Sequence, residues 1–229
     1  MTPFPKIIAL DGPAASGKTT VGERLAQCLN YLYFDTGVMY RAVTYAAMET
    51  LHNVDDEGLV TEIAERIHID VQPPSLQDGR MYDVSMDGQD VTWQLRLPEV
   101  EANVSKVSAY PGVRRAMTEQ QRRIGERGAA VIVGRDIGTV VFPDAELKIY
   151  LVASVEERAR RRFEELQLRG SQATYAEILE AMRKRDAYDA SRVVAPMKPA
   201  EDAIIINTDG QSIEQVVLQV KTHFQASQG

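Results

Sequence analysis

The chain has 229 residues, of which 44% are hydrophobic and 26% charged, and its formal net charge is −7. A chain of this size and composition can bury a substantial core, and it favours one large globular domain or one domain with an insert. The negative balance argues against a surface that coats nucleic acid polymers or anionic membranes, so any bound polyanion must meet locally concentrated arginines.

The start of the chain and its single cysteine bear on the compartment. Residues 1–6 lack a basic segment followed by an apolar stretch, so we expect no secretory signal. No apolar run is long enough to span a bilayer. Cys28 cannot form an intramolecular disulfide, which favours a reducing, cytoplasmic setting. Because Cys28 shares a predicted helix face with Val21 and Leu25, we expect it in the core rather than as a nucleophile.

Residues 7–20 read IIALDGPAASGKTT and have the pattern of a phosphate-binding loop. An apolar strand precedes the G-x-x-x-x-G-K-[ST] signature and a helical pattern follows it, which is the context that this loop requires. Its glycines allow backbone N–H groups to turn toward phosphate oxygens, Lys18 would reach the β and γ phosphates, and Thr19 would bind Mg²⁺. A chance glycine-rich turn is the alternative. The predicted ATP-binding residues are Gly12, Pro13, Ala14, Ala15, Ser16, Gly17, Lys18, Thr19 and Thr20.

Near-continuous apolar runs alternate with helical patterns along the chain. Such runs suit strands that are buried on both faces of a parallel sheet. The five predicted strands are Ile7–Leu10, Leu32–Phe34, Ala130–Val133, Leu147–Val152 and Ala203–Ile206. Helices are expected at about 19–30 and 37–51, and two later ones begin with the capping boxes at 154–157 and 174–177, with Gly170 closing the first of these two. Together these elements predict an α/β three-layer P-loop fold with a five-stranded parallel sheet.

One segment between the second and third predicted strands breaks this rhythm. Apolar and polar residues alternate at 67–71 and at 82–86, and Asp87-Gly88 is a strong turn signal. We therefore expect a small antiparallel ribbon, with helices at about 56–66 and at 99–126, the latter broken at Pro111-Gly112. The ribbon and helices form an insert that projects from the core sheet.

Two polar clusters follow predicted strands, at the edge where open α/β sheets bind ligands. Asp35-Thr36-Gly37 leads into a helix on which Arg41 can point at an anion, although a capped helix with a solvated arginine fits equally well. Arg135-Asp136, bracketed by glycines, is costly to keep at the end of a buried strand without a ligand or a mutual ion pair. Both a ligand site and a structural pair remain open for it.

Two further clusters lie on predicted helices. Arg185, Asp189 and Arg192 are spaced to share one face, and spacing alone favours an exposed charge ladder over a clamp on phosphate and sugar. Arg158 lines a face with its neighbours at 161 and 162, where like charges repel unless an anion joins them. That helix is either a flap that closes over ATP phosphates or a solvated helix.

These pieces together resemble the bacterial cytidylate kinases, a family of nucleoside monophosphate kinases. The resemblance covers nearly the whole chain through GPAASGKTT, FDTGVMYR, the inserted ribbon, NVSKVSAYPGVR, VGRDIGTVVFPDA and RKRDAYDASRVVAP. It implies transfer of the γ-phosphoryl group of ATP to CMP and dCMP, with ATP and Mg²⁺ bound. It also implies a core at 1–59 and 113–229, a lid at about 155–172 and a monophosphate-binding insert at 60–112. We expect a cytoplasmic monomer that binds neither nucleic acid polymers nor membranes.

The resemblance assigns roles to individual residues of this sequence. The cytosine edge would be read by Ser105, Arg114 and Asp136, and the ribose by Arg185 and Asp189. The acceptor phosphate would be held by Arg41, Arg135 and Arg192, which with Lys18 form the catalytic set, while Thr36 lies beside the substrate. Arg158 and Arg162 would belong to the ATP-binding lid. These roles favour the clamp over the exposed ladder.

Two positions depart from the family pattern. Val133 stands where many members carry an acidic residue, so we expect Thr19, ATP oxygens and waters as the Mg²⁺ ligands. Thr36 stands where serine is common, and this change keeps the hydroxyl. Two other functions are alternatives: a kinase for UMP, dTMP or a small alcohol, and a nucleotide-dependent switch that transfers no phosphate to a metabolite. The first gives no reason for the cytosine-reading residues to converge, and the second lacks a water-positioning group.

Overall fold

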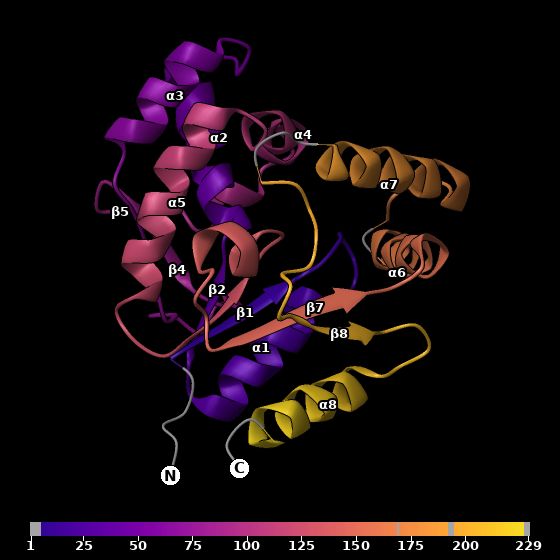
Figure 1. The fold of residues 1–229 in the computed structure, drawn as a ribbon. Coiled ribbons are helices and arrows are strands. Elements are labelled where there is room, and N and C mark those ends of the chain that lie inside the picture. Colours follow the sequence, from indigo (N-terminus) through magenta and orange to yellow (C-terminus); the bar gives the residue numbers. More distant parts are fainter. Residues whose placement is uncertain (1–5, 169, 192–194, 227–229) are drawn as a thin grey trace.

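A five-stranded parallel sheet forms the centre of the molecule in the computed structural model, which describes residues 6–168, 170–191 and 195–226 (Figure 1). The strand order is β2-β6-β1-β7-β8, and all four pairings are parallel. The strands are β1 (Ile7–Asp11), β2 (Leu32–Asp35), β6 (Ala130–Val133), β7 (Leu147–Val152) and β8 (Ile204–Asn207). The predicted fold class is confirmed, and the strand ends differ from the predicted ones by at most one residue.

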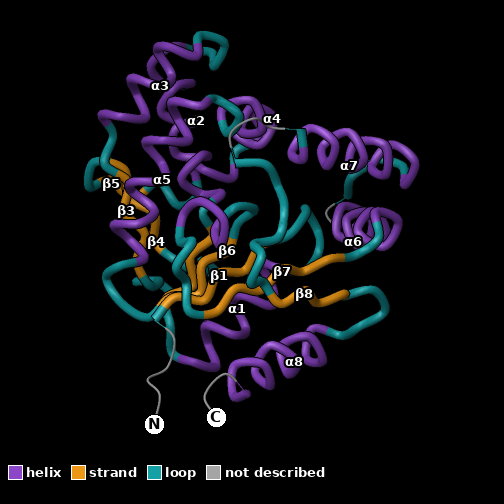
Figure 2. Tube along the Cα trace, in the orientation of Figure 1, coloured by secondary structure: helices purple, strands orange, loops and turns teal. Residues whose placement is uncertain are grey.

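Helices cover both faces of this sheet and make three layers (Figure 2). On one face lie α1 (Lys18–Leu29) and α8 (Ile213–Ala226), and on the other lie α2 (Gly37–Leu51) and α5 (Pro111–Gly125). Successive strand residues point to opposite faces, so Ile8 joins the apolar cluster under α1 and α8 whereas Ala9 joins the cluster under α2. Because the strands are parallel, the loops that follow β1, β2 and β6 meet at one edge of the sheet.

The predicted insert is present between β2 and β6. It contains α3 (Glu57–Arg66), β3 (Ile69–Gln72), β4 (Asp83–Met86), β5 (Gln89–Asp90), the short helix η1 (Gln94–Arg96) and α4 (Pro98–Val107). The three strands form an antiparallel sheet, and Asp87 and Gly88 both have positive φ (50° and 82°), as a tight hairpin turn requires. One apolar cluster runs from the core sheet into this insert, joining Phe34 of β2 to Val84 of β4.

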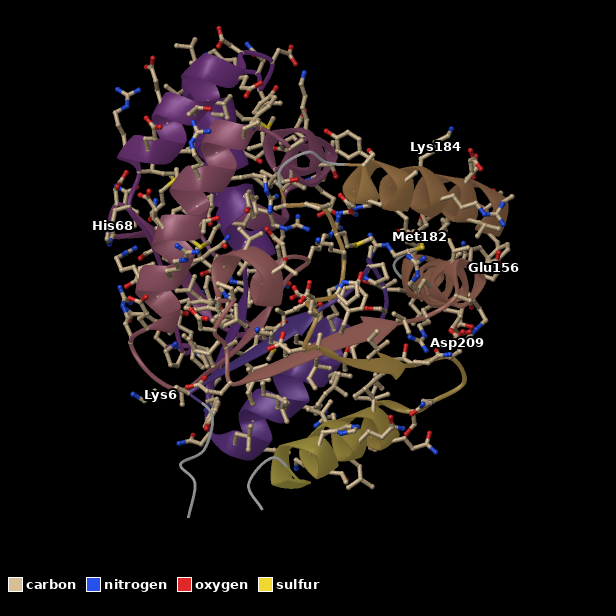
Figure 3. All side chains as sticks on the ribbon, in the orientation of Figure 1. Lys6, His68, Glu156, Met182, Lys184 and Asp209 are labelled. Carbon is tan, nitrogen blue, oxygen red and sulfur yellow. The ribbon has the colours of Figure 1, made fainter. Side chains whose placement is uncertain are left out.

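A helical hairpin formed by α6 (Val155–Leu168) and α7 (Tyr175–Ala190) lies beyond the end of β7 (Figure 1). The two helices pack through a small apolar cluster, and Figure 3 shows Met182 of α7 pointing toward α6 while Lys184 points away. At the start of α7, Thr174 and Glu177 form the predicted capping box. Gly170, with a φ of 76°, follows α6 as predicted.

Three local predictions need correction. The box at Ser154 is only half formed, because Asp209 rather than Glu157 accepts from the Ser154 backbone N–H (2.9 Å). The break between α4 and α5 comes before Pro111, which is the first residue of α5. Cys28 is exposed rather than buried. The buried stripe of α1 is centred between Val21 and Ala26, and at about 100° per residue Cys28 falls about 90° from that centre.

Candidate active site

The loop between β1 and α1 has the backbone geometry of a phosphate cradle. Gly12 has a φ of 146°, and a Cβ there would lie 2.2 Å from the carbonyl oxygen of Leu151, so only glycine fits. Gly17, with a φ of 93°, stands at the N-cap of α1 and has no side chain with which to cap it. The first N–H groups of α1 and its positive dipole end are therefore available to an anion.

Lys18 lies at the first position of α1 and bends back over the loop. Its Nζ donates a hydrogen bond to the Pro13 carbonyl oxygen (2.6 Å). The pKa of the Lys18 ammonium is lowered to about 7, mainly by burial and in part by the charge of Arg135, while the charge of Asp35 acts in the opposite direction. A polyanion beside this ammonium would favour its charged form.

Asp11, at the end of β1, ties the phosphate-binding loop to the turn after β6. Its carboxylate accepts hydrogen bonds from the backbone N–H groups of Ile137 (2.9 Å) and Gly138 (2.8 Å). These residues open a single π-helical turn, η2 (Ile137–Val141). Burial raises the pKa of the Asp11 carboxyl to about 6, against the lowering effect of the two hydrogen bonds. The turn that carries Arg135 and Asp136 is thereby fixed relative to the loop.

A cavity of about 230 Å³ opens at this edge, between the loop, the ends of β2 and β6, and helices α2, α4, α5 and α7. It brings together most of the residues singled out from the sequence. Those that line it are Ala14, Ala15, Lys18, Thr19, Thr36, Arg41, Ser105, Arg114, Arg135, Asp136 and Arg185. Residues far apart in the sequence therefore meet at one cavity.

An ion pair between Arg114 and Asp136 lies on one wall of the cavity. Both side chains are less than 10% exposed. Arg114 also donates to the Ser108 carbonyl oxygen (2.9 Å), and its guanidinium lies 5.4 Å from the centre of the Tyr40 ring. The pair presents fixed donors and a fixed acceptor to a ligand. In place of the mutual Arg135–Asp136 pair that the sequence left open, Asp136 pairs with Arg114 and Arg135 with Asp189.

Two other arginines of the cavity pair with carboxylates from different elements. Arg135 contacts Asp189 of α7, and Arg41 contacts Glu101 of α4. Asp189 is 2% exposed, so the exposed charge ladder favoured by spacing alone is wrong. Asp189 does not itself line the cavity but reaches it through Arg135. Arg192 lies outside the described residues.

Thr36 serves as a tie between two strand ends. Its hydroxyl donates to the Val133 carbonyl oxygen (3.0 Å), and its backbone N–H donates to the same oxygen (3.0 Å). The Asp35 carboxylate accepts from the Gly37 N–H (2.9 Å) and so begins α2. These bonds hold the start of α2, and with it Arg41, at the cavity.

The arginines of α6 differ from the expected set of mutually repelling charges, because each has an acidic partner. Arg158 is buried and pairs with Asp186 of α7 (2.5 Å), and it also donates to the Ala14 carbonyl oxygen of the phosphate-binding loop (3.3 Å). Arg162 pairs with Glu165 (2.8 Å). Arg158 thus attaches α6 to the loop, whereas Arg162 pairs with a residue of its own helix.

Arg161 also lies beside the loop, which sequence reasoning missed. Its guanidinium donates to the Thr208 carbonyl oxygen (2.5 Å) and is 3.9 Å from where a Cβ on Gly17 would lie. Glu101, Tyr40 and Asp186 were missed as well. A charged residue at the end of an apolar strand could have indicated Asp11, but no local pattern identifies the others.

The few protein oxygen atoms that could bind a metal at the cavity suit an ion held mainly by the phosphate oxygens of a bound nucleotide. Among residues 6–168, 170–191 and 195–226, no three His, Cys, Asp or Glu side chains are grouped so that they could bind a metal. Thr19, exposed at the start of α1, offers a hydroxyl beside the loop. Mg²⁺ commonly takes one or two protein oxygens and fills its shell with phosphate oxygens and waters, so these residues fit it.

In the part of the chain that the structure describes, no helix is both long and apolar enough to cross a membrane.

The family model and the curated relatives agree on one family. The family model described as cytidylate kinase matches residues 8–226. A cytidylate kinase from Herpetosiphon aurantiacus is 50% identical over 212 residues, which cover 93% of this chain and 91% of that protein. One from Roseiflexus castenholzii is 51% identical over 217 residues, covering 94% and 92% respectively.

A more distant likeness concerns the fold alone. The crystal structure of a protein from Eubacterium ventriosum aligns with a TM-score of 0.50 at 12% identity, over 96% of this chain and 98% of that one. The family model and the curated relatives each span nearly the whole chain, as the resemblance found in the sequence did. The chain belongs to the cytidylate kinase family.

Proposed function

We propose that the cavity holds CMP or dCMP while the loop of residues 12–20 holds ATP, so that the γ-phosphoryl group passes to the acceptor phosphate. The products are ADP and CDP or dCDP. Family membership supports a cytidine monophosphate as acceptor. The single observation that carries the base assignment is the buried Arg114–Asp136 pair on the cavity wall.

Cytosine and this pair have complementary hydrogen-bonding groups. The exocyclic amino group of cytosine is a donor and suits the Asp136 carboxylate, while the ring nitrogen and carbonyl oxygen are acceptors and suit Arg114. Ser105 adds a hydroxyl from α4. Uracil would place a carbonyl oxygen against the carboxylate, which leaves two acceptors facing each other in a buried site.

The chemistry needs no dedicated base, because the nucleophile is a phosphate oxygen that is already anionic at neutral pH. The protein's contribution is in-line positioning and charge neutralisation. Lys18 supplies positive charge at the transferred group, and Arg41 and Arg135 hold the acceptor phosphate. Arg192 completes this set by resemblance, and Arg185 with Asp189 contacts the ribose.

Mg²⁺, when bound, neutralises charge on the ATP phosphates. Of the chain's own groups the Thr19 hydroxyl is the proposed ligand, and the apolar Val133 supplies none. Arg158 and Arg162 are assigned to the ATP side, where α6 serves as a lid over about 155–172. Closing that lid excludes water, which would otherwise compete with CMP for the phosphoryl group.

The proposed function also assigns a role to each domain of the chain. Residues 60–112 serve as the monophosphate-binding insert, and 1–59 with 113–229 form the core. All the groups invoked belong to one chain, so we take the monomer to be the active unit. The single cysteine fits a reducing cytoplasm.

An assay of ADP release across CMP, dCMP, UMP, AMP and dTMP tests this function. We expect CMP and dCMP to be preferred, with kcat/KM for UMP at least ~100-fold lower, since a buried polar site rejects a base that leaves its groups unpaired. Equal or higher kcat/KM for UMP or dTMP would contradict the base assignment. ATP turnover that ignores every monophosphate would contradict the kinase assignment.

A further inference from the structure

The ion pair between Arg41 and Glu101 links the acceptor cavity to the insert. Arg41 lies one turn into α2 and lines the cavity, and Glu101 lies on α4. Glu101 and Ser105 are four residues apart, so they share a face of α4, and Ser105 also lines the cavity. The Glu101 carboxylate thus binds the guanidinium of Arg41, which the proposed function assigns to the acceptor phosphate.

The surroundings of Glu101 are strongly positive. Burial acts to raise the pKa of the Glu101 carboxyl, but the hydrogen bond and charge of Arg41, with the charges of Arg162 and Arg185, leave that pKa below its usual value. These arginines come from α2, α6 and α7 respectively. Glu101 therefore supplies negative charge where arginines of three helices would otherwise repel one another.

The pair is accessible enough to exchange partners. The side chains of Arg41 and Glu101 are 29% and 49% exposed, so the carboxylate can move into water at small cost. A phosphate dianion carries more charge than a carboxylate and would contact Lys18 and Arg135 as well as Arg41. These differences favour replacement of the carboxylate by the ligand rather than simultaneous binding of both.

We propose that Glu101 is a competing anion for Arg41, which the acceptor phosphate must displace. The inference rests on the proposed role of Arg41. Displacement costs free phosphate and CMP the same amount, so Glu101 lowers both affinities by one factor and does not change their ratio. Its effect is a lower occupancy of the site at any given concentration of free phosphate, which lacks the base contacts of CMP. Glu101 is thus an affinity-setting residue of the acceptor site.

Variants of Glu101 distinguish competition with phosphate for Arg41 from a role in positioning Arg41. Glu101→Gln removes the charge and keeps a hydrogen-bond acceptor for Arg41, Glu101→Asp keeps the charge, and Glu101→Ala removes both. Glu99→Gln is the matched control, because Glu99 is an exposed glutamate in the first turn of the same helix. Inorganic phosphate is the probe, as a competitive inhibitor against CMP at saturating ATP, which keeps phosphate out of the ATP loop.

For Glu101→Gln we expect the inhibition constant of phosphate and the KM for CMP to fall together, by about 2- to 5-fold, with kcat within about 2-fold of wild type. Glu101→Asp and Glu99→Gln should both stay near wild type. Unchanged or weaker phosphate inhibition in Glu101→Gln overturns the proposal, and weaker binding in both Gln and Ala variants shows instead that Glu101 positions Arg41. Arg41→Ala tests the underlying role: if it leaves phosphate inhibition unchanged, the assignment of Arg41 itself fails.

Discussion

Lys18 should make ATP binding depend on pH in a range where the nucleotide itself hardly titrates. Burial and, to a smaller extent, the charge of Arg135 lower the pKa of this ammonium to about 7. A bound triphosphate places negative charge beside the ammonium and returns its pKa toward the ordinary value of a lysine. The complex therefore holds a proton that part of the free protein has lost, so ATP binding takes up a proton and weakens as pH rises.

The magnitude follows from the free-state pKa. With a pKa of about 7, roughly a quarter of Lys18 is charged at pH ~7.5 and about 1% at pH ~9. If the bound lysine stays charged, the dissociation constant of ATP rises about 20-fold across this range, or about 1.8 kcal/mol. Phosphate groups lose their last proton near pH ~6, so the nucleotide contributes little there.

Calorimetric titration with ATP, in two buffers of different ionisation enthalpy, measures both the affinity and the proton uptake. Uptake should be about three quarters of a proton at pH ~7.5 and close to one at pH ~9. Lys18→Arg is the matched control, because its guanidinium stays charged and its ATP affinity should not change over the range. A wild-type affinity that is equally flat, with no proton uptake, would refute the reasoning.

Three further variants, with one matched control, test the loop, the lid and the base site. Gly12→Ala brings a Cβ within 2.2 Å of a main-chain oxygen, and we expect about 1–3 kcal/mol less unfolding free energy in urea and at least ~10-fold weaker ATP binding; wild-type values would contradict this. Arg158→Ala removes a side chain that is 5% exposed and leaves the Asp186 carboxylate, 25% exposed, without this partner, so it should lower the unfolding free energy by about 2–3 kcal/mol. Arg160→Ala, at a position that is 52% exposed, should lower the unfolding free energy by at most about 1 kcal/mol. Equal decreases for Arg158→Ala and Arg160→Ala would show that the buried ion pair stabilises the fold no more than the exposed one. Asp136→Asn should raise the KM for CMP at least ~10-fold and narrow the preference over UMP, and an unchanged preference would remove Asp136 from base recognition.

The sheet was predictable because its signal is local. Five short apolar runs gave all five strands, and only their ends shifted: β1 extends to Asp11 because Asp11 still pairs with Tyr150 in the parallel register. The capping box at Thr174 and the turn at Asp87 are local patterns too, and both are present. The π-helical turn after β6 was not predictable, because it depends on hydrogen bonds to a carboxylate 126 residues earlier in the chain.

The candidate site was predictable in its members and not in its partnerships. Motifs indicated which arginines converge, since strand ends meet at one edge of a parallel sheet. Spacing on a helix then showed which residues share a face, but not what packs against it. Spacing alone favoured an exposed face for Asp189, yet Asp189 is buried against Arg135, which lies 54 positions earlier. Such pairs depend on how the insert and the α6–α7 hairpin sit over the core.

The ion pairs of the site have a shared consequence for substrate binding. Arg41 contacts a carboxylate of α4, Arg135 one of α7, and Arg158 of α6 another of α7. The cationic site is thus neutralised without ligand, by acidic groups on the same helices that surround the cavity. A phosphate that takes over one of these arginines also loosens the contact between two elements, so the cost of binding depends on how well the released carboxylate is solvated. The Arg41–Glu101 pair is partly exposed whereas Asp189 is buried, so replacing Glu101 by phosphate costs less free energy than replacing Asp189. Acceptor phosphate should therefore displace Glu101 from Arg41 more readily than it separates Arg135 from Asp189.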